Sequence, residues 1–212
     1  LGVASTQKIG ENRNFVKFYL RLEKFKLFQL LRYVVYKIKG SSKKQNGNKT
    51  LMQSVVADQV IPYKSKKYKL ALKNYKENLN EIISIISKKD IPVLTSTLVS
   101  NLKGQAPFVS VFSEKFLQQK EWDDLFEGGL ELFDQGDYKA ALEFFNKNIE
   151  MDETPAKAHY FLAKCYEQLG EFEKALDSYT KARDLDALRF RASSEINEII
   201  QSVCSAQNVP VV

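Results

Sequence analysis

Apolar residues in the second half of the chain recur at helical spacing, and the whole pattern returns after 34 residues. Five pairs of similar residues each stand 34 positions apart: Gly136 and Gly170, Tyr138 and Phe172, Ala141 and Ala175, Leu142 and Leu176, and Phe145 and Tyr179. A period of 34 residues is typical of a helix–turn–helix unit that stacks on copies of itself. The pattern therefore predicts two helical hairpins over residues 122–187.

The residue types at fixed places in both copies suit closely packed helices. Small residues stand where helices would cross, at Gly129, Ala141, Ala163 and Ala175. Two further glycines, Gly136 and Gly170, stand at helix ends, where a positive φ angle is needed. On these residues, positions 122–187 resemble the tetratricopeptide (TPR) repeat family, which implies a docking module. The first copy departs from that family's pattern at Asn148, which replaces a preferred Ala, and at Leu132, which replaces a preferred aromatic residue.

Two repeats are few, because stacked repeats usually need about three units to bury a continuous face. Apolar residues from Phe190 to Cys204 recur at helical spacing. This stretch predicts a C-terminal capping helix for the repeats, within residues 188–212. The N-terminal side of the repeats would be covered by the rest of the chain.

Residues 1–120 show a different organisation. A helical stripe runs from Tyr68 to Ser87, and a β-branched run follows it, which predicts a strand at about 92–99. Val209–Val212 predicts the start of a second strand after the C-terminal helix. The expected fold class is therefore predominantly α with a small parallel β element, in which two TPR hairpins and a capping helix are attached to a partial α/β domain.

Residues 15–38 form an amphipathic pattern rich in Lys and Arg, and two interpretations of it stay open. Such a helix can contact a membrane surface, or it can be an ordinary core-facing helix with a basic solvated side. The run is too often interrupted to predict a membrane span. Residues 40–50 (GSSKKQNGNKT) are polar and predict a linker.

The net charge of +6 hides a division within the chain. Residues 1–120 hold 23 Lys or Arg against 7 Asp or Glu, whereas residues 121–212 hold 9 against 19. The change at Glu121 predicts a boundary just before the repeats. The basic part favours an acidic partner, and the nearest one is the other half of the same molecule, so intramolecular docking is expected first. Nucleic acid is disfavoured, because no nucleic-acid-binding module is recognised.

The segments outside the repeats carry a second resemblance. They are Leu1–Thr6, Phe18–Leu22 with Gln29–Arg32, Asn78–Ile83, Leu94–Lys103, Pro107–Phe108, Leu188–Ala192 and Val209–Val212. Together they resemble a bacterial group of GDSL/SGNH hydrolase-like proteins that carry TPR repeats inside the hydrolase domain. The resemblance implies a three-layer α/β/α fold and a serine esterase or acyltransferase, with an extracytoplasmic or membrane-anchored parent protein.

The catalytic motifs implied by that resemblance do not stand in this sequence. They are a Gly-Asp-Ser turn, oxyanion-hole Gly and Asn residues, and a late Asp-x-x-His pair, and we expect them to lie before Leu1 and after Val212. The one histidine, His159, falls on a repeat helix, and Cys165 and Cys204 lack a metal-ligand spacing. We therefore expect no catalytic, metal or cofactor site in this chain.

The favoured function is a protein-interaction module. Its inner helices, 122–134 and 156–168, would present their exposed side chains to a peptide or protein partner, or to the neighbouring hydrolase half. A basic peptide would suit the acidic repeats. The candidate surface residues are Asp124, Glu127, Glu131, Lys157, Tyr160, Lys164 and Glu167.

Overall fold

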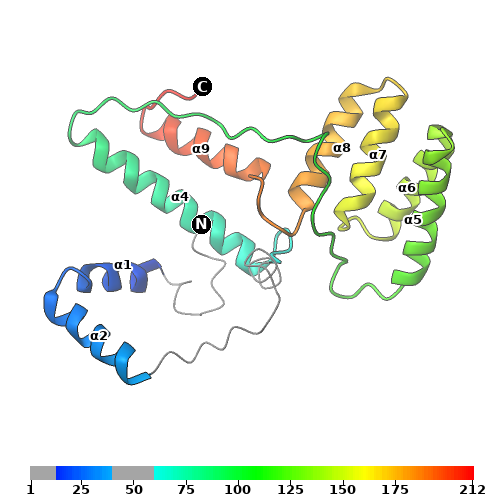
Figure 1. Cartoon of the computed structure of the whole chain (residues 1–212). Coiled ribbons are helices and arrows are strands. Elements are labelled where there is room, and N and C mark those ends of the chain that lie inside the picture. Colours follow the sequence, from blue (N-terminus) through cyan, green and yellow to red (C-terminus); the bar gives the residue numbers. More distant parts are fainter. Residues whose placement is uncertain (1–12, 40–59) are drawn as a thin grey trace. The chain divides into compact units, whose positions relative to one another are not determined.

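In the computed structural model, which describes residues 13–39 and 60–212, the two repeats fold as two helical hairpins (Figure 1). The first hairpin consists of α5 (Gln119–Asp134) and α6 (Tyr138–Met151), and the second of α7 (Ala156–Gln168) and α8 (Phe172–Leu185). The turns form as predicted, because Gly136 and Gly170 have φ angles of 82° and 78°, in the left-handed region that glycine tolerates.

The first hairpin and α7 share one apolar core. Trp122 and Phe126 stack with their ring centroids 5.2 Å apart, and Phe126 contacts Phe145 of α6. Gly129 lets the two helices approach, because a Cβ atom at this position would lie 2.8 Å from Cε1 of Phe145. The α7 residues Ala158, Leu162 and Cys165 complete this core.

Two hydrogen bonds with Trp122 account for the departure of Asn148 from the repeat pattern. Its side-chain amide donates to the backbone carbonyl of Trp122 at 2.8 Å, and the Trp122 indole N–H donates to the carbonyl of Asn148 at 2.8 Å. Both side chains are fully buried. The two bonds link the start of α5 to the end of α6, and an alanine at position 148 would lose the one that its side-chain amide donates.

The second compact part of the repeat-bearing unit is a pair of helices, α4 (Lys66–Ser87) and α9 (Ser194–Ala206), which lie side by side in Figure 1. Ser65 begins α4 by accepting a hydrogen bond from the backbone N–H of Tyr68. Ile83 of α4 is buried among Ile200, Val203 and Cys204 of α9.

This packing corrects the predicted capping role of residues 190–204. A helix does form there, but its apolar face is buried against α4 instead of against the second hairpin. Phe190, counted in the predicted stripe, precedes the helix and contacts Phe108. On α8, Phe172 and Leu176 remain 69% and 57% exposed.

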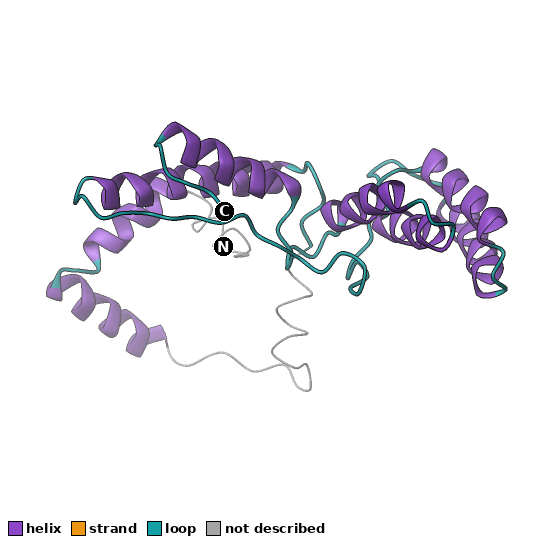
Figure 2. Ribbon diagram, turned by 90° about the horizontal axis from the view of Figure 1, so that it is seen from above, coloured by secondary structure: helices purple, strands orange, loops and turns teal. Residues whose placement is uncertain are grey.

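The predicted strands are also corrected. No described residue belongs to a regular strand, as Figure 2 shows, although Thr95 and Val211 form an isolated parallel bridge. The N–H of Thr95 donates to the carbonyl of Pro210 at 3.1 Å, and the N–H of Thr97 donates to that of Val212 at 3.0 Å. Asn197 of α9 then binds the backbone N–H and carbonyl of Leu98 with its side-chain amide. A helix side chain thus takes the place that a further strand would occupy.

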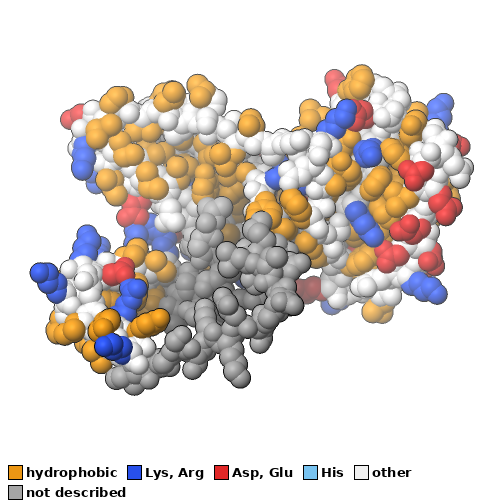
Figure 3. All heavy atoms as spheres, viewed as in Figure 1, with side chains coloured by type: hydrophobic (Ala, Val, Ile, Leu, Met, Phe, Trp, Pro, Cys, Tyr) orange, Lys and Arg blue, Asp and Glu red, His pale blue; other side chains and the backbone are white. Residues whose placement is uncertain are grey.

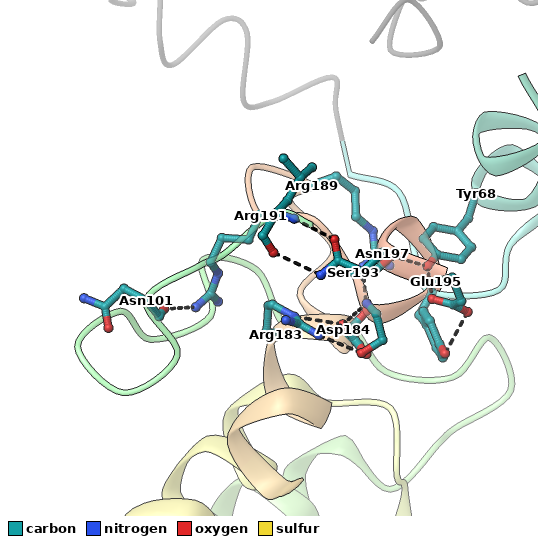
Figure 4. A network of polar contacts seen from close by, with 12 residues as sticks. Tyr68, Asn101, Arg183, Asp184, Arg189, Arg191, Ser193, Glu195 and Asn197 are labelled. Carbon is teal, nitrogen blue, oxygen red and sulfur yellow. Dashed lines mark hydrogen bonds and ion pairs between the residues drawn. The ribbon is translucent and has the colours of Figure 1, made fainter. Parts of the chain in front are cut away.

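A buried turn joins the helix pair to the hairpins. The Asp186 carboxylate accepts hydrogen bonds from the backbone N–H groups of Phe108, Val109 and Leu188, at 3.0, 3.0 and 3.1 Å, and pairs with Arg191 at 3.3 Å. Arg191 in turn donates to two more backbone carbonyls, those of Asn101 and Gln105. Figure 4 shows Arg191 reaching Asn101.

Arg189 connects the same turn to the start of α4. It donates to the carbonyls of Ile61 and Asp184 and lies 4.6 Å from the ring centre of Tyr68. The Tyr68 hydroxyl contacts Ser193 and donates to Glu195, both near the start of α9 (Figure 4). Burial lowers the pKa of Arg189, while these anionic and phenolic neighbours favour its charged form.

The chain divides between Gln59 and Val60 into two compact units, so the repeats and the α4–α9 pair belong to one unit. The boundary that the charge pattern predicted, at Glu121, lies within the second of these units. The described part of the first unit contains α1 (Arg13–Leu22) and α2 (Lys26–Lys39). The linker predicted at 40–50 lies outside the described residues.

We predict that Asn148→Ala destabilises the protein, although it restores the preferred repeat residue. The substitution leaves the buried ends of α5 and α6 without one hydrogen bond, which costs about 1–3 kcal/mol of unfolding free energy. Chemical denaturation measures this loss, and the partly buried neighbour Asn146→Ala, which should change stability by less than about 0.5 kcal/mol, is the control. A neutral or stabilising Asn148→Ala would contradict the prediction.

We further predict that Asp186→Asn is among the most damaging single changes in this unit. It leaves the Arg191 guanidinium buried without its carboxylate partner and turns an N–H donor toward backbone N–H groups, which costs about 3–5 kcal/mol. The exposed Asp177→Asn on α8 is the matched control. Equal denaturation midpoints for the two variants would show that the junction does not hold the unit together.

Candidate protein-interaction surface

Four of the predicted surface residues share one side of α7. Lys157, Tyr160, Lys164 and Glu167 are spaced three or four residues apart, which places them in one row along the helix, and each is partly exposed. We call this row and the α5 side chains that it contacts the α5–α7 face.

The two lysines of this face lie over aromatic rings. Lys157 forms an ion pair with Asp123 at 3.0 Å, and its Nζ lies 4.8 and 4.6 Å from the ring centres of Trp122 and Phe126. Lys164 lies 4.8 Å from the ring centre of Phe133 and 5.3 Å from that of Phe161. Phe133 and Phe161 are partly exposed and contact each other edge to face. The face therefore combines cationic groups with accessible aromatic surface.

Tyr160 and Glu167 are bound by a segment of the same chain that is distant in the sequence. The Tyr160 hydroxyl donates to the carbonyl of Lys103 at 2.8 Å, and the Lys103 ammonium forms an ion pair with Glu167. The neighbouring Leu102 packs against Ala163, Ala175 and Tyr179. The segment 101–105 is thus docked on the second hairpin.

The repeat period shows which element this segment replaces. In the first hairpin, Ala141 and Phe145 are covered by Ala158 and Leu162 of the next helix, α7. One period later, the equivalent Ala175 and Tyr179 are covered by Leu102. Segment 101–105 therefore lies where the first helix of a further repeat would pack.

The remaining predicted residues, Asp124, Glu127 and Glu131, are exposed on α5. The α5 residues in contact with the lysines of α7 are others, Trp122, Asp123, Phe126 and Phe133, and the sequence prediction missed them. The 34-residue period contains a signal for Asp123, which stands one period before its ion-pair partner Lys157.

The electrostatics of the face depend on the docked segment. The Lys103 ammonium lowers the pKa of Glu167, assisted by the Tyr179 hydroxyl and opposed by partial burial. Burial raises the pKa of Tyr179, and its hydrogen bond to Glu167 raises it further. Glu167 is therefore held as a carboxylate between two donors.

The groups considered for chemistry have structural surroundings. His159 is buried, its Nε2 lies 2.9 Å from the carbonyl of Glu153, and burial lowers the pKa of the ring. Burial raises the pKa of the Cys165 thiol to about 12. Over residues 13–39 and 60–212, no three His, Cys, Asp or Glu side chains are grouped so that they could hold a metal ion. None of the described helices is both long and apolar enough to cross a membrane.

Comparison with known proteins supports the repeat type. Residues 110–182 match the family model described as "Anaphase-promoting complex, cyclosome, subunit 3". A stretch of 45 residues is 58% identical to "Anaphase-promoting complex subunit 3" of Dictyostelium discoideum, which is 21% of this chain but only 4% of that protein. No solved structure matches.

Together with the helical hairpins, these matches support a protein of the TPR type. This repeat type suggests a non-catalytic, scaffold role for the chain, through contact with protein partners in general. The resemblance to a bacterial GDSL/SGNH hydrolase finds no support, either in these matches or in a sheet among the described residues.

We predict that Lys103→Met raises the pKa of Glu167 toward the ordinary value of about 4.3, because its main stabilising cation is removed. Carboxyl carbon chemical shifts, followed by NMR as pH is lowered, measure this change. Lys115→Met, in the loop before α5, should leave the Glu167 pKa unchanged. An unaltered Glu167 in the Lys103→Met protein would show that segment 101–105 is not docked in solution.

Proposed function

We propose that the chain is a protein-interaction module whose α5–α7 face binds an extended segment of a partner protein. One observation supports this most directly: Lys157 and Lys164 both lie over aromatic rings of the two inner helices, and two of these rings, Phe133 and Phe161, are partly exposed. Aromatic residues surrounded by charged groups are frequent centres of binding energy at protein interfaces.

The chemistry of the face favours a partner segment with a carboxylate next to an apolar side chain. The apolar side chain could pack on Phe133 and Phe161, while the carboxylate pairs with Lys164. A desolvated ion pair of this kind fixes the register of the segment. This partner differs from the basic peptide suggested by the net charge of the repeats, because the central charges of the face are lysines.

The docked segment 101–105 limits where a partner would bind. Tyr160 and Glu167 are already occupied by Lys103, so the available part of the face is the side of Lys157 and Lys164 that is turned toward α5. The similar Dictyostelium protein is named as a subunit of a complex, which is consistent with a repeat pair that contacts other protein chains. The contact with the chain's own segment and the contact with a partner would then use neighbouring parts of one surface.

Selection from a displayed library of random peptides on the 212-residue chain tests this function. We expect the selected peptides to carry Asp or Glu beside an apolar residue. They should bind at least about tenfold more weakly to the double variant Lys157→Glu, Lys164→Glu, because a favourable charge pair becomes a repulsive one.

The control is the double variant Lys139→Glu, Lys147→Glu on α6. It makes the same charge change, and Lys147 also lies over an aromatic ring, that of Phe144. Peptides rich in Lys and Arg would contradict the proposal and favour a site determined by overall charge. If both double variants weakened peptide binding equally, the binding site would lie outside the α5–α7 face.

A further inference from the structure

We call residues 13–39, in which a short turn joins α1 to α2, the α1–α2 hairpin. This hairpin has no core of its own. None of the residues 13–37 is buried, and α1 and α2 are 10 and 14 residues long. Helices of this length are marginal in water unless an apolar face is covered, since an isolated helix needs about 12–15 residues. The hairpin therefore needs a surface that covers its exposed apolar side chains.

In α1 the polar and apolar residues are cleanly separated. At 100° per residue, Arg13, Asn14, Lys17 and Arg21 fall within an arc of about 100°, and the remaining arc is aromatic or aliphatic throughout. On this apolar arc, Phe18 and Leu20 are 58% and 53% exposed. Apart from Asn14, the polar face of α1 is entirely basic.

The second helix shows the same arrangement with more apolar surface. Its widest apolar arc carries five exposed aliphatic residues, Leu27, Leu30, Leu31, Val34 and Val35. Lys26, Arg32 and Lys37 lie on the other side, where Tyr33 and Tyr36 are also exposed. The Tyr19 and Phe28 rings contact edge to face and hold the two helices together. Figure 3 shows the apolar and basic side chains of the α1 and α2 region beside one another on its surface.

The charge of the hairpin selects the kind of surface. Residues 13–37 hold seven Lys or Arg and a single acidic residue, Glu23, which forms an ion pair with Arg32. Helices with a basic polar face and a broad aromatic and aliphatic face are typical of segments that lie in the interface of a lipid bilayer. Basic residues near such a surface add attraction to anionic headgroups.

We propose that the α1–α2 hairpin binds the surface of an anionic membrane, with both apolar arcs in the boundary between headgroups and acyl chains. An anionic membrane suits both the wide apolar arcs and the basic residues of the hairpin. Its acyl chains are apolar over a wide area, and its headgroups carry negative charge. The helices lie along the surface and do not cross it, because neither is long enough to span the hydrocarbon layer. This contact uses residues other than those of the α5–α7 face.

The test measures co-sedimentation of the full chain with vesicles of phosphatidylcholine containing about one third phosphatidylserine, and with vesicles of phosphatidylcholine alone. We expect binding to the anionic vesicles, at least tenfold weaker binding to the neutral ones, and weakening by added salt. The double variant Leu27→Gln, Leu31→Gln should lose at least about tenfold in affinity, because two apolar side chains no longer enter the interface.

The matched control is Leu94→Gln, Leu117→Gln, which replaces two leucines that are 67% and 94% exposed in the other unit. This control should bind the vesicles like the unaltered chain. The proposal is overturned if the unaltered chain ignores anionic vesicles or if the two double variants bind equally. It is also overturned if the unaltered chain is a dimer in light scattering and only Leu27→Gln, Leu31→Gln is a monomer, since a second copy then covers the hairpin.

Discussion

The Asp186 carboxylate is the point at which the repeat-bearing unit is held together. A buried carboxylate is costly unless its oxygens are occupied, and here three backbone N–H groups and the Arg191 guanidinium occupy them. Because two of those N–H groups belong to Phe108 and Val109, the turn after α8 is tied to the chain that leads into the repeats. The two arginines that follow connect the same turn to two further segments, because Arg189 donates to the carbonyl of Ile61 and Arg191 to that of Asn101.

The docked segment 101–105 depends on this junction. Arg191 binds the carbonyls of Asn101 and Gln105 at the two ends of the segment, so that Leu102 and Lys103 are presented to the second hairpin between them. A helix of a further repeat would bury more surface there, but it would also cover Tyr160 and the rest of the α7 row. The short segment covers Ala175 and Tyr179 while it leaves the lysines toward α5 accessible.

Local patterns in the sequence were sufficient to predict the elements that are determined by residues close together in the chain. The two hairpins and α4 follow from apolar spacing, and Gly136 and Gly170 mark the turns because no other residue takes a positive φ as easily. The partner of α9 could not be predicted this way, since a row of apolar residues shows that a face is buried but does not show what buries it. Ile200 and Val203 meet Ile83, more than a hundred positions earlier.

The same limit applies to the strand and to the candidate face. The β-branched run at 92–99 did favour an extended chain, but a regular strand needs a continuous ladder with a neighbour. Here the run forms only an isolated bridge with Val211, and the Asn197 side chain of α9 binds the backbone of Leu98. On α5, exposure alone suggested Asp124, Glu127 and Glu131. Lys157 and Lys164 contact other α5 residues, and of these contacts the Asp123–Lys157 pair stands one 34-residue period apart in the sequence.

Charge counted over half of the chain and charge at a contact lead to different partners. The repeats carry a large excess of acidic residues, yet the residues over the aromatic rings of the α5–α7 face are lysines. Net charge governs solubility and long-range attraction, whereas a bound segment meets only the groups within a few ångströms. Lys103, from the basic half, already neutralises Glu167, so part of the acidic excess is balanced within the unit. The local arrangement of Lys157 and Lys164, and not the excess of acidic residues, should therefore decide which segment the face selects.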